Sequence, residues 1–260
     1  MKTTIYCFSG TGNSLKIARE LAVAIGECEV LGIPGLMKSP APGAETERVG
    51  FVTPVYFFGI PRMVRRFVEK IDLRKAKYIF AVATPGGRGD ILRQFQELLE
   101  DKGQKLDAGF TVKMPGNYLS FYTASSAAEQ NEVFAKASRK LEEVAAAIKS
   151  GQTTVEKSAL LVRLIAGLVY GPWLKGLPKK GGRFYAEENC NGCGLCEKVC
   201  PSDNISLING RPHWSDRCEE CYACLNFCPL MAIQINKKTK GQGRYHQPDI
   251  TVDDIIALKE

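Results

Sequence analysis

Eight of the ten cysteines in this 260-residue chain lie between residues 190 and 228, in two copies of one spacing. Each copy reads C-x2-C-x2-C-x3-C-P, and a shift of 28 residues superimposes the first on the second without a gap. The match extends outward, since Arg183 falls on Arg211 and Ile205 falls on Ile233. A duplication of this length predicts a small module with pseudo-twofold symmetry.

This spacing is typical of iron–sulfur ligands. Three closely spaced cysteines can surround a [4Fe–4S] cluster, and a fourth cysteine beyond a turn reaches the cluster of the other copy. The first predicted site comprises Cys190, Cys193, Cys196 and Cys228, and the second comprises Cys218, Cys221, Cys224 and Cys200. Structural zinc is the alternative, but zinc sites usually pair two C-x2-C knuckles around one tetrahedron. The third cysteine and the Cys-Pro step fit zinc poorly.

On these motifs, residues 184–260 resemble bacterial-type ferredoxins with two [4Fe–4S] clusters, and every ligand position of that family is filled. The resemblance implies a small α+β domain whose clusters exchange electrons. It also implies an anaerobic or reducing cytoplasm, because solvent-near clusters of this kind are oxygen-labile.

The first 150 residues have a different pattern, in which short apolar runs alternate with helical periodicity. Strands are expected at 3–8, 29–33, 48–53, 78–84 and 106–113, and helices at 13–25, 61–71, 90–101 and 125–149. Strands separated by helices predict an α/β fold with a doubly wound, five-stranded parallel sheet. The ligand crevice of such a sheet lies at the carboxyl ends of its strands.

A candidate phosphate site follows the first expected strand, in the sequence SGTGNS at residues 9–14. It lacks the lysine of a Walker loop, and Leu15 replaces the third glycine of a dinucleotide fingerprint. What remains is a glycine-rich loop at a helix N-terminus, whose N–H groups and hydroxyls can hold a phosphate monoester. The candidate residues are Ser9, Gly10, Thr11, Gly12, Asn13 and Ser14. An ordinary structural turn is the alternative.

Residues 1–150 resemble flavodoxins in the order of their strands, in the position of this loop and in its character. The resemblance implies that the loop binds the phosphate of FMN and that the loops after the third and fourth strands hold the isoalloxazine ring. Those loops contribute Pro54, Val55, Tyr56, Phe57, Phe58 and Gly59, and then Thr84, Pro85, Gly86, Gly87 and Gly89. The fourth-strand loop lacks the aromatic residue of many flavodoxins, so Tyr118 is a candidate to stack on the ring instead.

Together the two halves resemble bacterial flavodoxin–ferredoxin fusion proteins. The resemblance implies an electron carrier that passes electrons between two [4Fe–4S] clusters and FMN, and so couples one-electron to two-electron chemistry. A flavin-dependent reductase of a small, quinone-like acceptor is the alternative, and a redox sensor is a third. Redox partner proteins, both donor and acceptor, are expected, whereas no basic run interleaved with aromatics indicates nucleic-acid binding.

Residues 151–183 are expected to connect the two domains through an apolar helix at 159–171 that ends at Pro172. We expect this helix at a domain or subunit interface, and Gly167 and Gly171 allow a homodimer. Association with a membrane surface is the alternative, since the run is too short to span a bilayer comfortably. The chain lacks a secretory signal pattern, which places it in the cytoplasm.

Charge is unevenly distributed along the chain. Residues 1–183 carry a net +10 and residues 184–260 a net −3, within a total of +7. The basic part suits an acidic partner or the acidic module of the same chain. Arg62, Arg65 and Arg66 follow the aromatic loop and are candidates for docking a redox partner, with a solvated helix face as the alternative.

Overall fold

The computed structural model describes residues 1–39, 42–120 and 123–260. Its main element is a parallel sheet in the order β2-β1-β3-β4-β5-β6. The strands are β1 (Thr3–Cys7), β2 (Cys28–Gly32), β3 (Arg48–Pro54), β4 (Tyr78–Thr84), β5 (Ala108–Thr111) and β6 (Thr154–Val155). The order 2-1-3-4-5 of the first five strands is that of a flavodoxin-like, doubly wound fold.

The sixth strand corrects the predicted sheet of five. Strand β6 pairs in parallel with β5, and the amides of Thr154 and Glu156 donate to the carbonyls of Asp107 and Gly109, each at 2.9 Å. Only two residues enter the ladder, which is too few for a period-2 pattern to show in the sequence. The predicted 151–183 connector therefore begins at the edge of the sheet.

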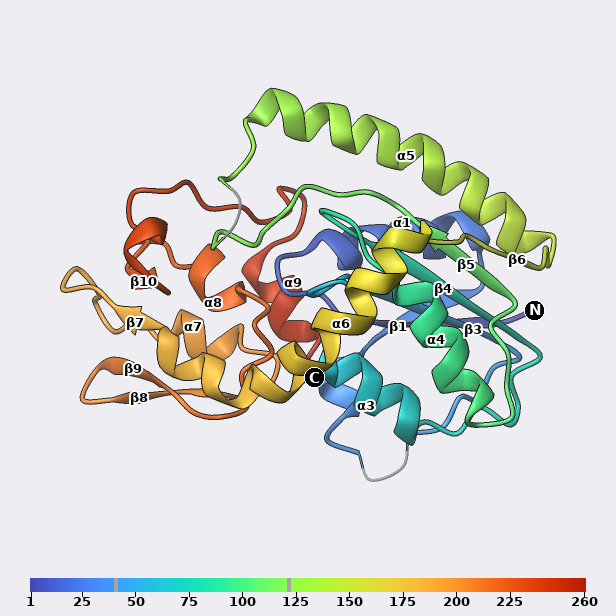
Figure 1. The fold of residues 1–260 in the computed structure, drawn as a ribbon, viewed down its shortest axis with the longest axis horizontal. Coiled ribbons are helices and arrows are strands. Elements are labelled where there is room, and N and C mark those ends of the chain that lie inside the picture. Colours follow the sequence, from blue (N-terminus) through green and yellow to red (C-terminus); the bar gives the residue numbers. More distant parts are fainter. Residues whose placement is uncertain (40–41, 121–122) are drawn as a thin grey trace.

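Helices cover the sheet as βαβ crossovers require (Figure 1). They are α1 (Asn13–Ile25), α2 (Ile33–Leu36), α3 (Arg62–Lys70), α4 (Ile91–Glu100) and α5 (Ala127–Lys149). Helix α1 packs beside α5, and α3 packs beside α4. Their apolar faces close one core around β1, β3 and β4, in which Ile5, Phe51 and Phe80 are fully buried.

The cysteine-rich segment forms a second, smaller layer with its own core. It contains β7 (Tyr185–Ala186), α7 (Leu195–Lys198), β8 (Ile205–Ile208), β9 (Arg211–Trp214), α8 (Ala223–Asn226) and β10 (Ile233–Gln234). Strand β10 pairs with β7 and β8 with β9, both antiparallel. The pairs Ile205–Trp214 and Ile233–Ala186 are equivalent under the 28-residue shift, so the fold has the pseudo-twofold symmetry that the repeat predicts.

The end of the chain returns to the sheet. After the turn η2 (Lys237–Thr239), helix α9 (Val252–Ala257) packs its Ile255 into the main core beside Leu258. A Cβ atom at Gly32 would lie 2.1 Å from the Leu258 carbonyl oxygen, so β2 and the C-terminus meet in close backbone contact. The last residues of the predicted 184–260 domain thus lie on the first domain.

The connector helix α6 (Leu160–Gly176) is longer than predicted and passes through Pro172. It continues into η1 (Leu177–Arg183) because its C-terminal half is anchored: the Trp173 indole donates to Glu220 at 2.7 Å and Leu177 is fully buried. Within the described residues, Leu160–Arg183 is the one helical stretch long and apolar enough to cross a bilayer by length and composition alone. A single stretch of this kind is a weak indication of a membrane span.

Candidate functional site: two cysteine hollows and an adjoining cavity

The eight repeated cysteines gather into two groups of four, each around its own hollow. One hollow is lined by Cys190, Cys193, Cys196 and Cys228, and the other by Cys200, Cys218, Cys221 and Cys224. These are the two predicted ligand sets, including the exchange of the fourth cysteine between copies. In the described chain, no three acidic, histidine or cysteine side chains meet closely enough to hold a single metal ion. The first set is the more open, with Cys193 exposed, whereas the second is buried.

Left-handed backbone shapes both cysteine loops, and it recurs at equivalent positions. Gly192 and Gly194 have φ of +70° and +76°, and the residues 28 positions later, Glu220 and Tyr222, have φ of +51° and +62°. Left-handed φ is easy for glycine and strained for other residues. Strain at Glu220 and Tyr222 points to a role for their side chains.

The surroundings of the second hollow fit an iron–sulfur cluster. The amides of Asn204 and Glu220 donate to Cys200 Sγ and Cys218 Sγ, each at 3.3 Å, as expected around cluster thiolates. The buried amide nitrogen Asn204 Nδ2, which also lines this hollow, has no hydrogen-bond partner among the residues described. Burial raises the pKa of Cys218 to about 12, so these thiols need cationic iron beside them to become ligands.

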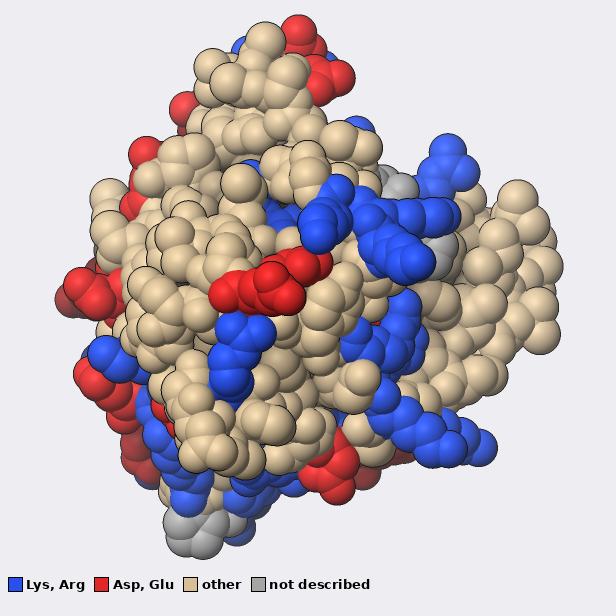
Figure 2. Space-filling model, turned by 90° about the vertical axis from the view of Figure 1, so that its left-hand side faces the viewer, with Lys and Arg blue, Asp and Glu red and all other residues tan. Residues whose placement is uncertain are grey.

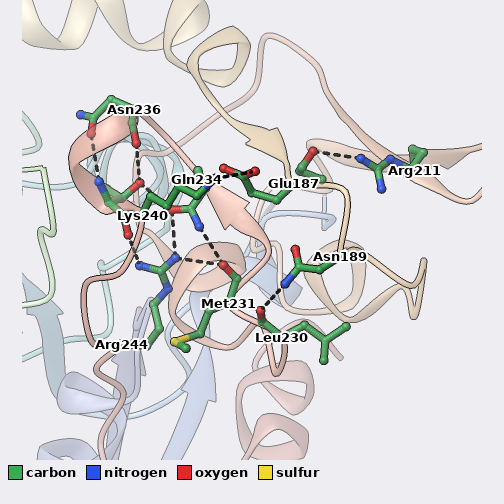
Figure 3. A network of polar contacts seen from close by, with 11 residues as sticks. Glu187, Asn189, Arg211, Leu230, Met231, Gln234, Asn236, Lys240 and Arg244 are labelled. Atoms are coloured by element: carbon green, nitrogen blue, oxygen red, sulfur yellow. Dashed lines mark hydrogen bonds and ion pairs between the residues drawn. The ribbon is translucent and has the colours of Figure 1, made fainter.

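Polar contacts hold together the loops of the first hollow (Figure 3). The Asn189 side chain donates to the Leu230 carbonyl at 3.0 Å, which joins the loops of Cys190 and Cys228. The Arg244 guanidinium donates to the carbonyls of Met231 and Ile233 at 3.3 and 3.0 Å. Because these residues border Cys228, the network holds the backbone around this predicted ligand in place.

A third cavity, of about 560 Å3, opens at the carboxyl ends of the strands. Its volume is within the range of small-molecule and cofactor sites, about 300–1,000 Å3. It collects most of the predicted flavin-site residues: Ser9, Gly10, Thr11, Asn13, Ser14, Pro54, Val55, Tyr56, Phe57, Phe58, Thr84, Gly86, Gly87 and Tyr118. Four others, Gly12, Gly59, Pro85 and Gly89, do not line it.

The predicted phosphate loop is held rigidly at the start of α1. The Gly12 amide donates to Ser9 Oγ at 3.1 Å, and Ser14 Oγ shares a hydrogen bond with Thr84 Oγ1 at 2.7 Å. The C-terminal tail contacts the same loop, since the Tyr245 hydroxyl donates to Asn13 Oδ1 at 2.6 Å. Gly12 has φ of +97° and closes the turn from behind, against Ile250, rather than facing the cavity.

The aromatic loop forms a tight turn, and its left-handed residues are the two that precede Gly59. Tyr56 and Gly59 exchange two backbone hydrogen bonds of 2.9 Å, and the left-handed residues are Phe57 and Phe58, with φ of +43° and +69°. Two left-handed central residues define a type I′ turn. Gly59 is needed for space, because a Cβ there would lie 2.5 Å from Gln94 Oε1.

The Tyr56 side chain links the cavity to the second hollow. It lines the cavity, and burial raises the pKa of its hydroxyl well above the usual value, with Cys221 the next cause. That hydroxyl is buried without a hydrogen-bond partner in the described structure. An orphaned donor at a cavity wall fits a bound group with acceptor atoms.

Nine other residues line the cavity that are not among the predicted site residues. They are Arg88, Pro115, Gly116, Asn117, Leu161, Val162, Ile165, Trp173 and Glu220. Trp173 stacks on Phe57, with the ring centroids 5.8 Å apart and an angle of 8° between the ring planes. Glu220 accepts hydrogen bonds from the Trp173 indole at 2.7 Å and from the Tyr118 hydroxyl at 3.1 Å. No sequence pattern places a connector helix over this crevice; the isolated Trp173 in an apolar helix was the one available signal.

One of the three arginines predicted to dock a redox partner, Arg62, is used inside the chain. Arg62 Nε donates to Glu219 Oε1 at 2.9 Å, and the Met63 amide at the start of α3 donates to Glu219 Oε2 at 3.0 Å. Glu219 lies next to the predicted ligand Cys218, and burial raises the pKa of the Glu219 carboxyl while Arg62 opposes that shift. Arg65 pairs with Glu69 at 3.0 Å, and Arg66 stays exposed.

Comparison with known proteins agrees with the cysteine geometry. Residues 189–233 match the family described as the 4Fe-4S dicluster domain. A polyferredoxin-like protein of Methanocaldococcus jannaschii is 36% identical over 59 residues, which cover 23% of this chain and 26% of that protein. The chain fuses a flavodoxin-like domain with a 4Fe–4S dicluster domain. The matched segment spans about a quarter of the length of this relative.

Solved structures also overlap with the fusion. A putative flavoprotein from Bacteroides uniformis overlaps with 44% of this chain and 92% of its own, at 18% identity and a TM-score of 0.37. A flavodoxin from the domain Archaea overlaps with 56% of this chain and 99% of its own, at 13% identity and a TM-score of 0.31. The flavodoxin-like assignment rests on the strand order of the sheet, and the dicluster domain supports an electron-transfer role.

Proposed function

We propose that the chain holds FMN in the 560 Å3 cavity and a [4Fe–4S] cluster in each cysteine hollow, and that it passes electrons between them. Each cluster exchanges one electron at a time and FMN exchanges up to two, so the bound set would couple one-electron and two-electron chemistry. The hydroxyls and amides of residues 9–14 would hold the phosphate, and the aromatic turn with Trp173 would enclose the ring.

The observation that carries this proposal is the direct contact between the phosphate loop and the second cysteine loop. A Cβ atom at Gly10 would lie 2.6 Å from the Cys221 carbonyl oxygen and 2.8 Å from the Tyr56 hydroxyl. Cys221 lines the second hollow, while Gly10, Tyr56 and Glu220 line the cavity. The two cavities therefore share one wall.

This shared wall implies an order of transfer. The set around Cys218 is inner, because its loop contacts the FMN cavity. The set around Cys193 is outer, because Cys193 is exposed to solvent. We expect electrons to pass between partner proteins, the outer cluster, the inner cluster and FMN, in either direction.

The composition of protein purified without oxygen tests the cofactor set. We expect about eight irons, eight sulfides and one FMN per chain. Cys193→Ser should lose about half of the iron and keep its FMN, because its loop does not line the cavity. Zinc in place of iron, or a chain unable to bind FMN, would contradict the proposal.

A reductase of an apolar acceptor is the second candidate, and the wall of the cavity favours it. Leu161, Val162 and Ile165 of α6 give one side of the cavity an apolar surface. Sustained turnover of a soluble quinone analogue under a chemical reductant would support an enzyme. A single reduction event without turnover would leave the carrier as the better description.

A further inference from the structure

Helix α6 has two apolar faces, and among the residues that the structure describes only one of these faces is covered. Val162, Ala166, Tyr170 and Trp173 are buried against the domain, with the Tyr170 hydroxyl donating to the Ile60 carbonyl at 2.7 Å. On the opposite face, four leucines at helical spacing are exposed: Leu160, Leu161, Leu164 and Leu168, at 59–76%. Soluble surfaces seldom carry four adjacent exposed leucines without a partner.

The charge around this leucine face has one sign. Residues 157–186 contain six basic residues and no acidic one. Lys180 and Arg183 approach Glu220 at 3.5 and 3.6 Å, but within the described structure Lys157, Arg163, Lys175 and Lys179 form no ion pair. Helix α6 lies at the front of the molecule in Figure 1, and this side becomes the right-hand side in the turned view of Figure 2. There, Figure 2 shows a projecting lobe that is free of charged side chains and bordered by Lys and Arg.

We propose that the leucine face of α6, residues 160, 161, 164 and 168, docks this protein onto an anionic lipid surface. Apolar side chains flanked by lysines and arginines insert at the boundary between headgroups and acyl chains, and the cations pair with anionic headgroups. The helix lies on the bilayer rather than across it, because its other face is fixed to the domain along its length.

Charge favours lipid over a second copy of the chain. An isologous dimer brings the same patch of both copies together, so Arg163, Lys175 and Lys179 of both copies would share one interface with no acidic residue in the segment to balance them. The proposal goes beyond the electron-transfer function and does not depend on it. Leu161 belongs both to the leucine face and to the lining of the cavity. The lipid-bound protein would therefore hold this side of the cavity at the lipid surface.

Vesicle sedimentation with the cofactor-loaded chain tests this proposal. We expect binding to mixed phosphatidylglycerol–phosphatidylcholine vesicles and much weaker binding to phosphatidylcholine alone. Leu164→Glu with Leu168→Glu should weaken binding at least about tenfold, because two apolar contacts are lost. Lys175→Ala and Lys179→Ala should each weaken it about fivefold, on anionic vesicles only.

Two matched variants keep the result specific to this face. Val23 is 85% exposed on α1, so Val23→Glu should leave vesicle binding unchanged. A Cβ atom at Gly167 would meet no atom within 4 Å, so Gly167→Leu extends the leucine face without a clash and should strengthen binding. Circular dichroism and cofactor content should match the parent chain in every variant.

Three outcomes would overturn the proposal. The first is a parent chain that fails to bind anionic vesicles, and the second is a leucine double variant that binds as well as the parent. The third is a dimer of the parent chain in sedimentation velocity that the leucine double variant no longer forms, together with no vesicle binding. The leucine face would then be an interface between copies.

Discussion

At the scale of single residues, two strained positions lie at the boundary between the cysteine module and the cavity. The first cysteine loop uses glycine at its two left-handed positions, whereas the second uses Glu220 and Tyr222. Glu220 accepts hydrogen bonds from Trp173 and Tyr118, and Tyr222 shares a 3.0 Å hydrogen bond with Ser120. Backbone strain is tolerated at these positions because the side chains join the two modules.

Tyr56→Phe should affect FMN binding and apo-protein stability in opposite directions. Without FMN the buried hydroxyl has no partner in the described structure, so its removal should leave the melting temperature unchanged or raise it. With FMN the lost hydrogen bond should weaken affinity about fivefold. Calorimetric titration of FMN into flavin-free protein measures the affinity.

The control for this prediction is Tyr78→Phe. The Tyr78 hydroxyl donates to the Gln152 carbonyl at 2.8 Å, and Tyr78 does not line the cavity. This variant should lower the melting temperature and leave FMN affinity unchanged. Equal behaviour of the two variants would contradict the role given to Tyr56.

At the scale of helices and strands, sequence periodicity predicts most of the sheet domain but not the elements that close the site. The strands around β1, β3 and β4 and the helices α1, α3, α4 and α5 follow directly from it. Strand β6, the continuation of α6 beyond Pro172 and helix α9 do not, because each is stabilised by distant contacts rather than by local pattern. The cysteine sets were predictable because their spacing is a local property, whereas the place of Trp173 and Glu220 in the cavity depends on how the modules pack.

Alanine substitutions at two glycines separate turn packing from helix propensity. Gly59→Ala should lower the free energy of unfolding by about 1–3 kcal/mol, because its Cβ displaces the Gln94 amide, whose Oε1 accepts from the Ile60 amide at 2.9 Å. Gly167→Ala, on the open face of α6, should raise it by up to about 1 kcal/mol. Urea denaturation of both variants checks this; a neutral Gly59→Ala would show that the turn is loosely packed.

Helix α9 offers a test of pH dependence. Hydrogen bonds from Arg19 and Thr251 lower the Asp254 pKa to about 2. A lowered folded-state pKa stabilises the protein above the ordinary aspartate pKa, about 3.9, and the effect disappears as the pH falls through about 2. Both pH 7 and pH 5 lie above these pKa values. Asp254→Asn should therefore raise the amide exchange rate in α9, relative to the parent chain at the same pH, by the same factor at pH 7 and at pH 5.

The matched control for α9 is Asp253→Asn, which removes a neighbouring first-turn charge on the exposed side of the same helix. It should change exchange far less than Asp254→Asn does. If the two variants behave alike, the helix dipole rather than the Arg19 pair anchors α9.

At the scale of the whole molecule, the two oppositely charged parts of the chain bind each other. Three ion pairs join these parts: Arg62 with Glu219, Lys16 with Asp249 at 2.8 Å, and Arg19 with Asp254 at 2.7 Å. In each of the three pairs the basic residue belongs to the sheet domain. The charge asymmetry of the sequence is therefore used inside the fold as well as on its surface. The Arg62 pair is the most buried of the three, and its Arg62 Nε and Glu219 Oε1 atoms are 2.9 Å apart.

Arg62→Gln should destabilise the cluster-loaded protein by about 3 kcal/mol, because it leaves the Glu219 carboxylate buried without its cation. Arg65→Gln, which breaks the exposed pair with Glu69, should cost about 0.5 kcal/mol or less. Adding Glu219→Gln to Arg62→Gln should recover part of the loss in a double-mutant cycle. Equal costs for the two arginines would mean that the modules do not depend on this pair.

The central claim is that electrons pass within one chain from the inner cysteine cluster to FMN. We would deliver about one electron per chain to the clusters by pulsed photoreduction without oxygen, and follow the absorbance of clusters and flavin. The account predicts transfer to FMN at a rate independent of protein concentration, retained in Cys193→Ser and lost in Cys218→Ser, with FMN bound in both. A rate that rises with concentration, or transfer that survives Cys218→Ser, would contradict it.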